Sequence, residues 1–144
     1  MSVVGDFPVR VVGVEQLGNR GRLLAVVNEV ESLLARLADS GACGSIDLRS
    51  MPMAPADRDG LRGIFAEGEV SAVIRALGET EVYESIVRGV WWVTHRSEDG
   101  RIAAEFIEVT HMPEILKTPP DDVADGLEVL HEQLAALDGE RHRA

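Results

Sequence analysis

Residues 69–109 contain four short runs in which apolar and polar side chains alternate, separated by only one to three residues. Alternation with a period of two is typical of strands that bury one face. Strands joined by such short connections can pair only as antiparallel neighbours. Asp99-Gly100 is the clearest hairpin turn, because both residues tolerate positive φ. We therefore expect an antiparallel meander with strands at residues 69–77, 80–88, 90–97 and 101–109.

Both tryptophans of the chain, Trp91 and Trp92, lie side by side in the third run. Their β-branched neighbours Val90, Val93 and Thr94 favour a strand over a helix here. Successive side chains of a strand point to opposite faces of the sheet. One tryptophan is therefore expected in the core. The other is expected to look outward, toward solvent, a covering helix or a partner, and is the first candidate for a binding surface.

The region before the meander combines helical and strand signals. Apolar residues recur at spacings of three and four from Leu23 to Leu37, which predicts a long helix with Asn19 as its N-cap and Gly41 at its end. Residues 45–50 alternate as a strand does, and Pro55 favours the start of a short helix that reaches Phe65.

A second long helix is expected at the C-terminal end, with Thr118 as its N-cap, Pro119 at its first position and an apolar stripe from Val123 to Leu137. These elements predict an α+β fold, with an antiparallel meander sheet of about five strands packed with two long helices and one short helix. We expect residues 1–18, which include Val9, Val11, Val12 and Val14, to form an arm or edge strand, residues 19–138 to form a single two-layer domain, and residues 139–144 to fray.

The chain has 144 residues and a formal net charge of −11. This acidic balance argues against nucleic-acid binding, which depends on a basic face, and against docking to an anionic membrane. No apolar run approaches the ~18 residues of a membrane span, and no secretory signal is visible, so we expect a cytoplasmic protein. The acidity either serves solubility or marks a docking surface for a basic partner.

The sequence contains no recognised catalytic motif. We therefore expect that the protein is not an enzyme and binds no cofactor. Ligands for a metal would have to come from Cys43, the only cysteine, with His95 or His111, which lie near strand ends and can come close to one another. None of these residues stands in a short-spacing metal motif. Glu105 and Glu108 are three residues apart on a strand, so they point to opposite faces and do not form an acid/base pair.

The segment Met51-Pro52-Met53 holds two flexible thioethers beside a stiff proline. Methionine fills irregular gaps in cores, and it also lines surfaces that accept varied apolar ligands. The segment is therefore either core or a recognition loop, and the sequence leaves both interpretations open.

Several segments resemble the conserved domain of HupH/HyaF-type hydrogenase expression proteins, and they occur in that family's order from about Leu23 to Leu137. Ala54 departs from the family pattern, in which Thr or Ser precedes the short helix, so that N-cap is weaker. The chain is also shorter than the longer members of the family. The matching segments are Ile46-Asp47-Leu48-Arg49-Ser50-Met51-Pro52-Met53 with Pro55 and Asp57, then residues 67–72, Gly89-Val90-Trp91-Trp92-Val93 with His95, and Ile107-Glu108-Val109-Thr110 with residues 113–116.

The resemblance implies a non-catalytic chaperone for the iron–sulfur small subunit of a nickel–iron hydrogenase, bound as a precursor with a twin-arginine signal peptide before assembly and export. Other maturation factors and a second copy of the chain are further candidate partners. The alternative is a transient carrier of an iron–sulfur cluster or metal that uses Cys43 with His95 or His111. The candidate partner-binding residues are Trp91, Trp92, Met51, Met53, Glu67, Glu69, Glu105 and Glu108.

Overall fold

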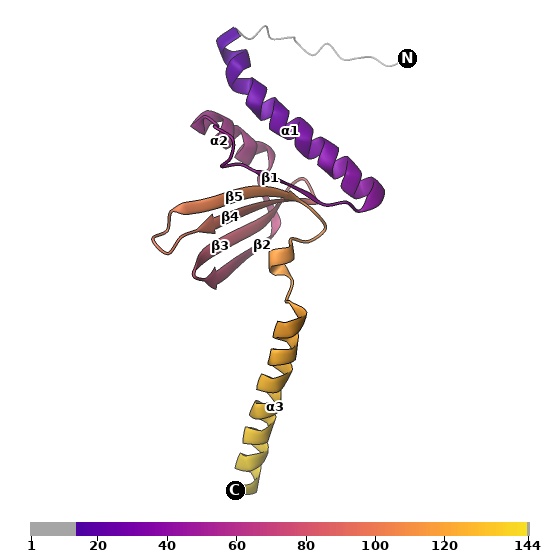
Figure 1. The fold of residues 1–144 in the computed structure, drawn as a ribbon, viewed down its shortest axis with the longest axis vertical. Helices are drawn as coiled ribbons and strands as arrows, with labels where there is room; N and C mark the ends of the chain where they lie inside the picture. Colours follow the sequence, from indigo (N-terminus) through magenta and orange to yellow (C-terminus); the bar gives the residue numbers. More distant parts are fainter. Residues whose placement is uncertain (1–13, 144) are drawn as a thin grey trace. The chain divides into compact units, whose positions relative to one another are not determined.

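The computed structural model describes residues 14–143 and divides the chain into two compact units, with the boundary after His111. The first unit is built on a five-stranded antiparallel sheet in the order β1-β5-β4-β3-β2 (Figure 1). The four strands of the expected meander are present, and β1 adds a fifth strand by pairing with β5. The strands are β1 (Gly44–Asp47), β2 (Glu67–Ala76), β3 (Gly78–Ser85), β4 (Val90–Arg96) and β5 (Ile102–Val109).

Two helices, α1 (Val14–Ser40) and α2 (Pro55–Ile64), form the second layer of this unit on one face of the sheet (Figure 1). α1 begins at Val14, so the prediction that Asn19 caps it is wrong, and residues 14–18 are helix rather than arm. The rest of the expected arm lies outside the described residues. The core between the layers contains Val26, Val30 and Leu37 of α1, Leu61 and Phe65 at α2, Ile46 and Leu48 at β1, and Val90, Trp92, Ile107 and Val109 of β4 and β5.

α2 begins as the sequence predicts, with Pro55 in its first turn. Ala54 at the N-cap makes no side-chain hydrogen bond, and its carbonyl oxygen accepts the backbone N–H of Asp57 at 3.0 Å. Leu61 and Phe65 turn into the core, and Asp57 of the same helix is also buried. Arg58 and Arg62 of α2 lie over the sheet, where both contact Glu105 of β5.

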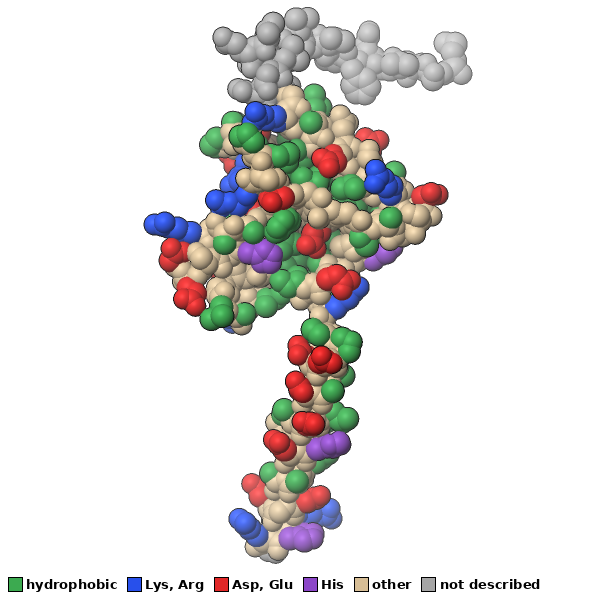
Figure 2. Space-filling model, in the orientation of Figure 1, with side chains coloured by type: hydrophobic (Ala, Val, Ile, Leu, Met, Phe, Trp, Pro, Cys, Tyr) green, Lys and Arg blue, Asp and Glu red, His purple; other side chains and the backbone are tan. Residues whose placement is uncertain are grey.

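The second unit contains a short 3₁₀ helix, η1 (Glu114–Leu116), and the long helix α3 (Pro120–Arg143). α3 continues through Gly139 to Arg143, so the expected fraying of residues 139–143 is wrong. None of its residues is buried, and Figure 2 shows apolar and acidic side chains along it. The α+β class is confirmed. No helix among the described residues has the length and apolar content to cross a bilayer.

Candidate functional site

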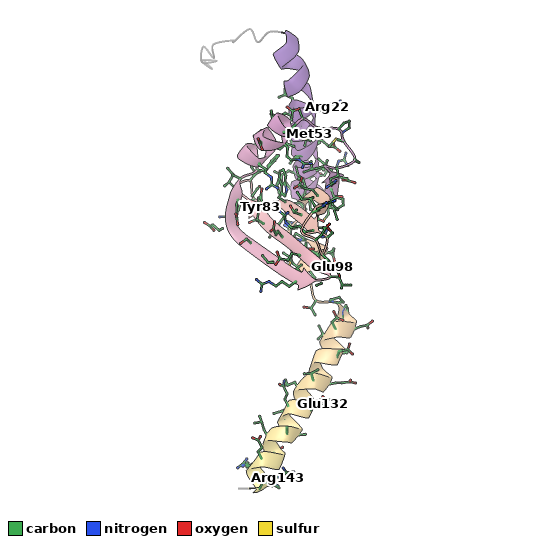
Figure 3. All side chains as sticks on the ribbon, turned by 90° about the vertical axis from the view of Figure 1, so that its left-hand side faces the viewer. Arg22, Met53, Tyr83, Glu98, Glu132 and Arg143 are labelled. Carbon is green, nitrogen blue, oxygen red and sulfur yellow. The ribbon has the colours of Figure 1, made fainter. Side chains whose placement is uncertain are left out.

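The segment Met51-Pro52-Met53 and helix α1 enclose a pocket of about 280 Å³. Met51 and Met53 are half-buried and contact the edge of the core cluster, while Pro52 is exposed. The sequence left open whether these methionines are core or recognition loop. In the structure they pack against the core and also line the pocket, and their role in recognition stays a prediction. Figure 3 shows Arg22 and Met53 close together at this place.

The α1 side of the pocket was not identified from the sequence. Arg22, Ala25 and Glu29 are exposed residues on one stripe of the helix, and Val26 is buried beneath them. Their spacing of three and four was visible in the sequence as helical periodicity. Only the tertiary contact of α1 with the methionine segment makes these residues the wall of a pocket. The pocket is therefore apolar at its floor, where Val26 lies, and its rim carries one cation, Arg22, and one anion, Glu29.

The structure buries both tryptophans, so the prediction that one lies exposed is wrong. Trp92 is 1 % exposed and stacks on Tyr83 at 6.3 Å between ring centroids. Trp91 lies on the opposite face of β4 and is 5 % exposed, and its indole N–H donates to the carbonyl oxygen of Thr110 at 3.0 Å. Trp92 belongs to the core cluster between sheet and helices, and all of Val90–Thr94 in the central strand β4 is buried.

Glu105 was expected as a surface carboxylate that pairs with client arginines, and this is wrong, because its side chain is fully buried. Its Oε2 accepts hydrogen bonds from Arg62 at 2.9 Å, from the indole N–H of Trp92 at 3.2 Å and from the hydroxyl of Thr94 at 3.4 Å. Arg58 lies 3.5 Å from Oε1, which accepts no hydrogen bond among the described residues. A buried carboxylate is stable only when it is paired in this way.

Arg58 and Arg62 are thus functional neighbours of Glu105 that the sequence analysis missed. They are spaced i, i+4 on α2, which places both on one face of the helix. The guanidinium of Arg62 lies 4.7 Å from the Trp92 ring centroid, a distance suited to a cation–π contact. The phenol of Tyr83 donates to the carbonyl oxygen of Phe65 at 2.9 Å, and burial raises the pKa of Tyr83 while Arg62 opposes the rise. This cluster ties α2 to the sheet.

The other acidic candidates remain outside the core. Glu67 and Glu69 are exposed on β2, which lies at the edge of the sheet, and Glu69 pairs with Arg88 at 3.1 Å. Glu108 faces Trp91 in the register of β5 and β4, on the side opposite Glu105, as expected from their spacing.

The three metal candidates do not converge. His95 is paired with Ala104 near the start of β5, and its Nδ1 lies 2.8 Å from the Thr80 hydroxyl. His111 follows the other end of β5, so the expectation that the two histidines come close is wrong. Cys43 is exposed at the end of the sheet near His111, with its thiol 3.3 Å from the Thr110 hydroxyl. The described residues contain no group of three or more His, Cys, Asp or Glu side chains able to hold a metal.

The described part of the chain thus combines a two-layer α+β unit with an apolar, methionine-lined pocket. Comparison with known proteins identifies its family. Residues 23–137 match the profile of the HupH hydrogenase expression protein, C-terminal conserved region. The chain therefore belongs to the HupH hydrogenase expression protein family, as the resemblance of its segments predicted.

The chain is similar to three curated hydrogenase expression/formation proteins. It is 28 % identical to HoxQ of Azotobacter vinelandii over 65 % of this chain and 33 % of the relative, and 26 % identical to HupQ of Azotobacter chroococcum mcd 1 over 85 % and 47 %. It is 29 % identical to HupH of Rhodobacter capsulatus over 78 % and 42 %. The chain thus spans less than half the length of these relatives.

A solved structure has the same fold. The hydrogenase expression protein HupH from Thiobacillus denitrificans superposes with a TM-score of 0.77 at 34 % sequence identity, covering 81 % of this chain and 97 % of that chain.

Proposed function

We propose that this chain acts in the maturation of a nickel–iron hydrogenase as a non-catalytic chaperone. Its client is the precursor of the iron–sulfur small subunit, held in the cytoplasm before assembly and export. The family relationship supports the hydrogenase context. The observation that carries the binding role is the pocket between α1 and Met51-Pro52-Met53, because flexible thioethers beside a rigid proline suit an apolar peptide segment.

The charge of the surface fits such a client. Glu29 stands at the rim of the pocket, and Glu67 and Glu69 are exposed on the edge strand β2. The net charge of −11 favours a segment that carries basic residues, as a twin-arginine signal peptide does, whereas the pocket rim itself holds both Arg22 and Glu29. Because Trp91, Trp92 and Glu105 are buried, the proposed contact surface is built without them.

The test is binding of the purified chain to the small-subunit precursor, with and without its signal peptide, measured by calorimetry. Ala25→Asp places a carboxylate in the pocket wall. Ala35→Asp makes the same change at another exposed position of α1, outside the pocket. We expect Ala25→Asp to weaken binding about tenfold or more and Ala35→Asp to leave it unchanged, since burying an unpaired charge costs more than ~1.4 kcal/mol.

If both variants bind the precursor with equal affinity, the pocket is not part of the contact. If the folded wild-type protein does not bind the precursor at all, the chaperone role is overturned. Loss of binding only when the signal peptide is removed would place the contact there. The carrier alternative has less support, because His95 lies at the opposite end of the sheet from Cys43 and His111. Iron or zinc retained after anaerobic reconstitution, and lost in Cys43→Ser, would favour it.

A further inference from the structure

The size of the pocket between α1 and Met51-Pro52-Met53 limits what it can hold. Its volume of about 280 Å³ lies just below the ~300–1,000 Å³ of typical small-molecule sites. A whole helix, which is about 10–12 Å across with its side chains, needs a longer groove. The pocket therefore suits one large apolar side chain, inserted from a segment of extended backbone. All of its lining residues belong to the first unit of the chain.

The two charged residues of the pocket differ in sign and lie at opposite ends of it along α1. Arg22 and Glu29 are seven residues apart, which places them on one face of the helix and about 10.5 Å apart along its axis. The buried side chain of Val26 lies between them at the floor. The pocket therefore has a positive end at Arg22, which Figure 3 labels, and a negative end at Glu29.

Neither of these charges is neutralised inside the fold. Arg22 and Glu29 are exposed, and neither forms a salt bridge with another described residue. By contrast, the arginines of α2 and of the β3–β4 connection are already paired with carboxylates. Arg22 and Glu29 can therefore act on a bound segment without first losing an ion pair of their own.

An extended segment can contact the floor and one end of the pocket at the same time. In extended backbone, residues i and i+2 point to the same side and lie about 6.6 Å apart. Glu29 is three residues from Val26, a rise of about 4.5 Å along the helix. A basic side chain two positions from an apolar one therefore reaches Glu29 when the apolar side chain lies over Val26. At the other end, Arg22 would repel the same basic side chain.

We propose, resting on the chaperone role, that Arg22 and Glu29 set the direction in which the client segment binds. The apolar side chain lies over Val26, the basic residue two positions away lies at Glu29, and the chain passes Arg22 with no basic residue there. Glu29 thus selects a basic neighbour and Arg22 excludes one. The net charge of −11 attracts any basic segment, whereas these two residues distinguish segments by the order of their charges.

The test is binding of the small-subunit precursor to charge-reversed variants of the full chain, measured by calorimetry. Glu29→Arg should weaken binding about fivefold more than Glu31→Arg, which makes the same change of charge about 200° away around α1. Arg22→Glu should strengthen binding about twofold or more relative to Arg75→Glu. This control makes the same change of charge on β2, at the edge of the sheet opposite β1.

Salt separates a charge effect from a change in the shape of the pocket. At ~1 M salt the Debye length falls to about 3 Å, so both charge-reversed variants should approach the affinities of their controls. The loss in Ala25→Asp should persist, because that variant buries an unpaired charge. A difference between Glu29→Arg and Glu31→Arg that is equally large in high salt would overturn the proposal. Far-ultraviolet circular dichroism checks that each variant keeps its helices.

Overlapping peptides that cover the precursor identify the bound segment. We expect the strongest binder to carry a basic residue two positions from a large apolar residue. Changing that basic residue to Gln should abolish the difference between Glu29→Arg and Glu31→Arg, because the partner of Glu29 is then gone. A strongest binder without this pattern, or a difference that survives the change, would contradict the proposed direction.

The outcomes separate this proposal from the chaperone role. If Ala25→Asp weakens binding while each charge-reversed variant matches its control, the chaperone role stands and the proposed direction is wrong. If Arg22→Glu binds more weakly than Arg75→Glu, Arg22 holds an acidic group of the client, and the proposal that it excludes a basic one is overturned. If the folded wild-type protein binds no precursor, both proposals are overturned.

Discussion

Glu105 of β5 and Arg62 of α2 form a 2.9 Å ion pair that joins the helical layer to the sheet. The carboxylate is fully buried, whereas the arginine side chain is 41 % exposed. The same carboxylate oxygen accepts the indole N–H of Trp92. One acidic side chain thus satisfies groups from a helix and from the neighbouring strand.

Glu105→Ala should destabilise the fold by about 2 kcal/mol. It leaves the indole of Trp92 and the hydroxyl of Thr94 without their buried acceptor, and each such group carries a desolvation cost. The two arginines keep part of their hydration, which limits the loss. The measurement is urea unfolding followed by far-ultraviolet circular dichroism.

The matched control is Glu79→Ala, which removes a carboxylate from the exposed pair with Arg75, in which the side chains are 82 % and 49 % exposed. Exposed pairs contribute about 0.5 kcal/mol or less, so this variant should unfold close to the wild type. Equal unfolding midpoints for Glu105→Ala and Glu79→Ala would show that the buried cluster adds nothing to stability.

Gly78→Ala should destabilise the sheet far more than Gly100→Ala. Both glycines end hairpin connections with positive φ, +89° and +84°, where an L side chain is strained by about 1–2 kcal/mol. A Cβ at Gly78 would also collide with the carbonyl oxygen of Arg96, whereas nothing lies within 4 Å of a Cβ at Gly100.

We expect Gly100→Ala to cost about 1 kcal/mol, and Gly78→Ala at least about 2 kcal/mol more, because a backbone atom must move. Urea unfolding of both variants measures the difference directly. If the two variants had the same unfolding midpoint, the β2–β3 turn would not be packed tightly against Arg96.

Tyr83 is the only tyrosine of the chain, so the phenolate absorbance reports its ionisation alone. Burial raises the pKa of this phenol, Arg62 lowers it, and Glu67 and Glu105 add to the rise. We expect a midpoint in the folded protein above the ordinary value of about 10 and a return to that value in urea.

This shift has a consequence for stability. A raised folded-state pKa favours the fold fully below the unfolded-state pKa, near 10, and the benefit is lost as pH rises through the folded-state pKa. Stability should therefore fall with pH above about 10. Tyr83→Phe removes the titrating group, so it should flatten that part of the curve. An unchanged slope in this variant would assign the alkaline loss to other groups.

Local patterns were sufficient for much of the fold. Alternation with a period of two over residues 69–109, broken by Gly78, Gly89 and Gly100, determines strands that pair with their sequence neighbours, because connections this short permit nothing else. The start of α2 at Pro55 follows from the fixed φ of proline. The segments that resemble the family were likewise enough to indicate it, and the family match over residues 23–137 agrees.

Only part of the candidate site could be predicted from the sequence. The sequence singled out Met51 and Met53 by their composition, but the wall formed by Ala25 and Glu29 depends on how α1 crosses that segment. Likewise, alternation showed that Trp91 and Trp92 face opposite ways, yet both are buried, because burial depends on which groups cover each face of the assembled sheet.

The sequence by itself therefore determined most of the elements and the meander, since these depend on near neighbours along the chain, and its segments indicated the family. Tertiary structure decided the rest. From the sequence alone, Glu105 looks like a surface carboxylate. In the fold it pairs with Arg58 and Arg62, which belong to a helix some forty residues earlier in the chain. A charge can be buried only beside suitable partners, and here these partners are distant in sequence. No local sequence pattern therefore predicts the burial.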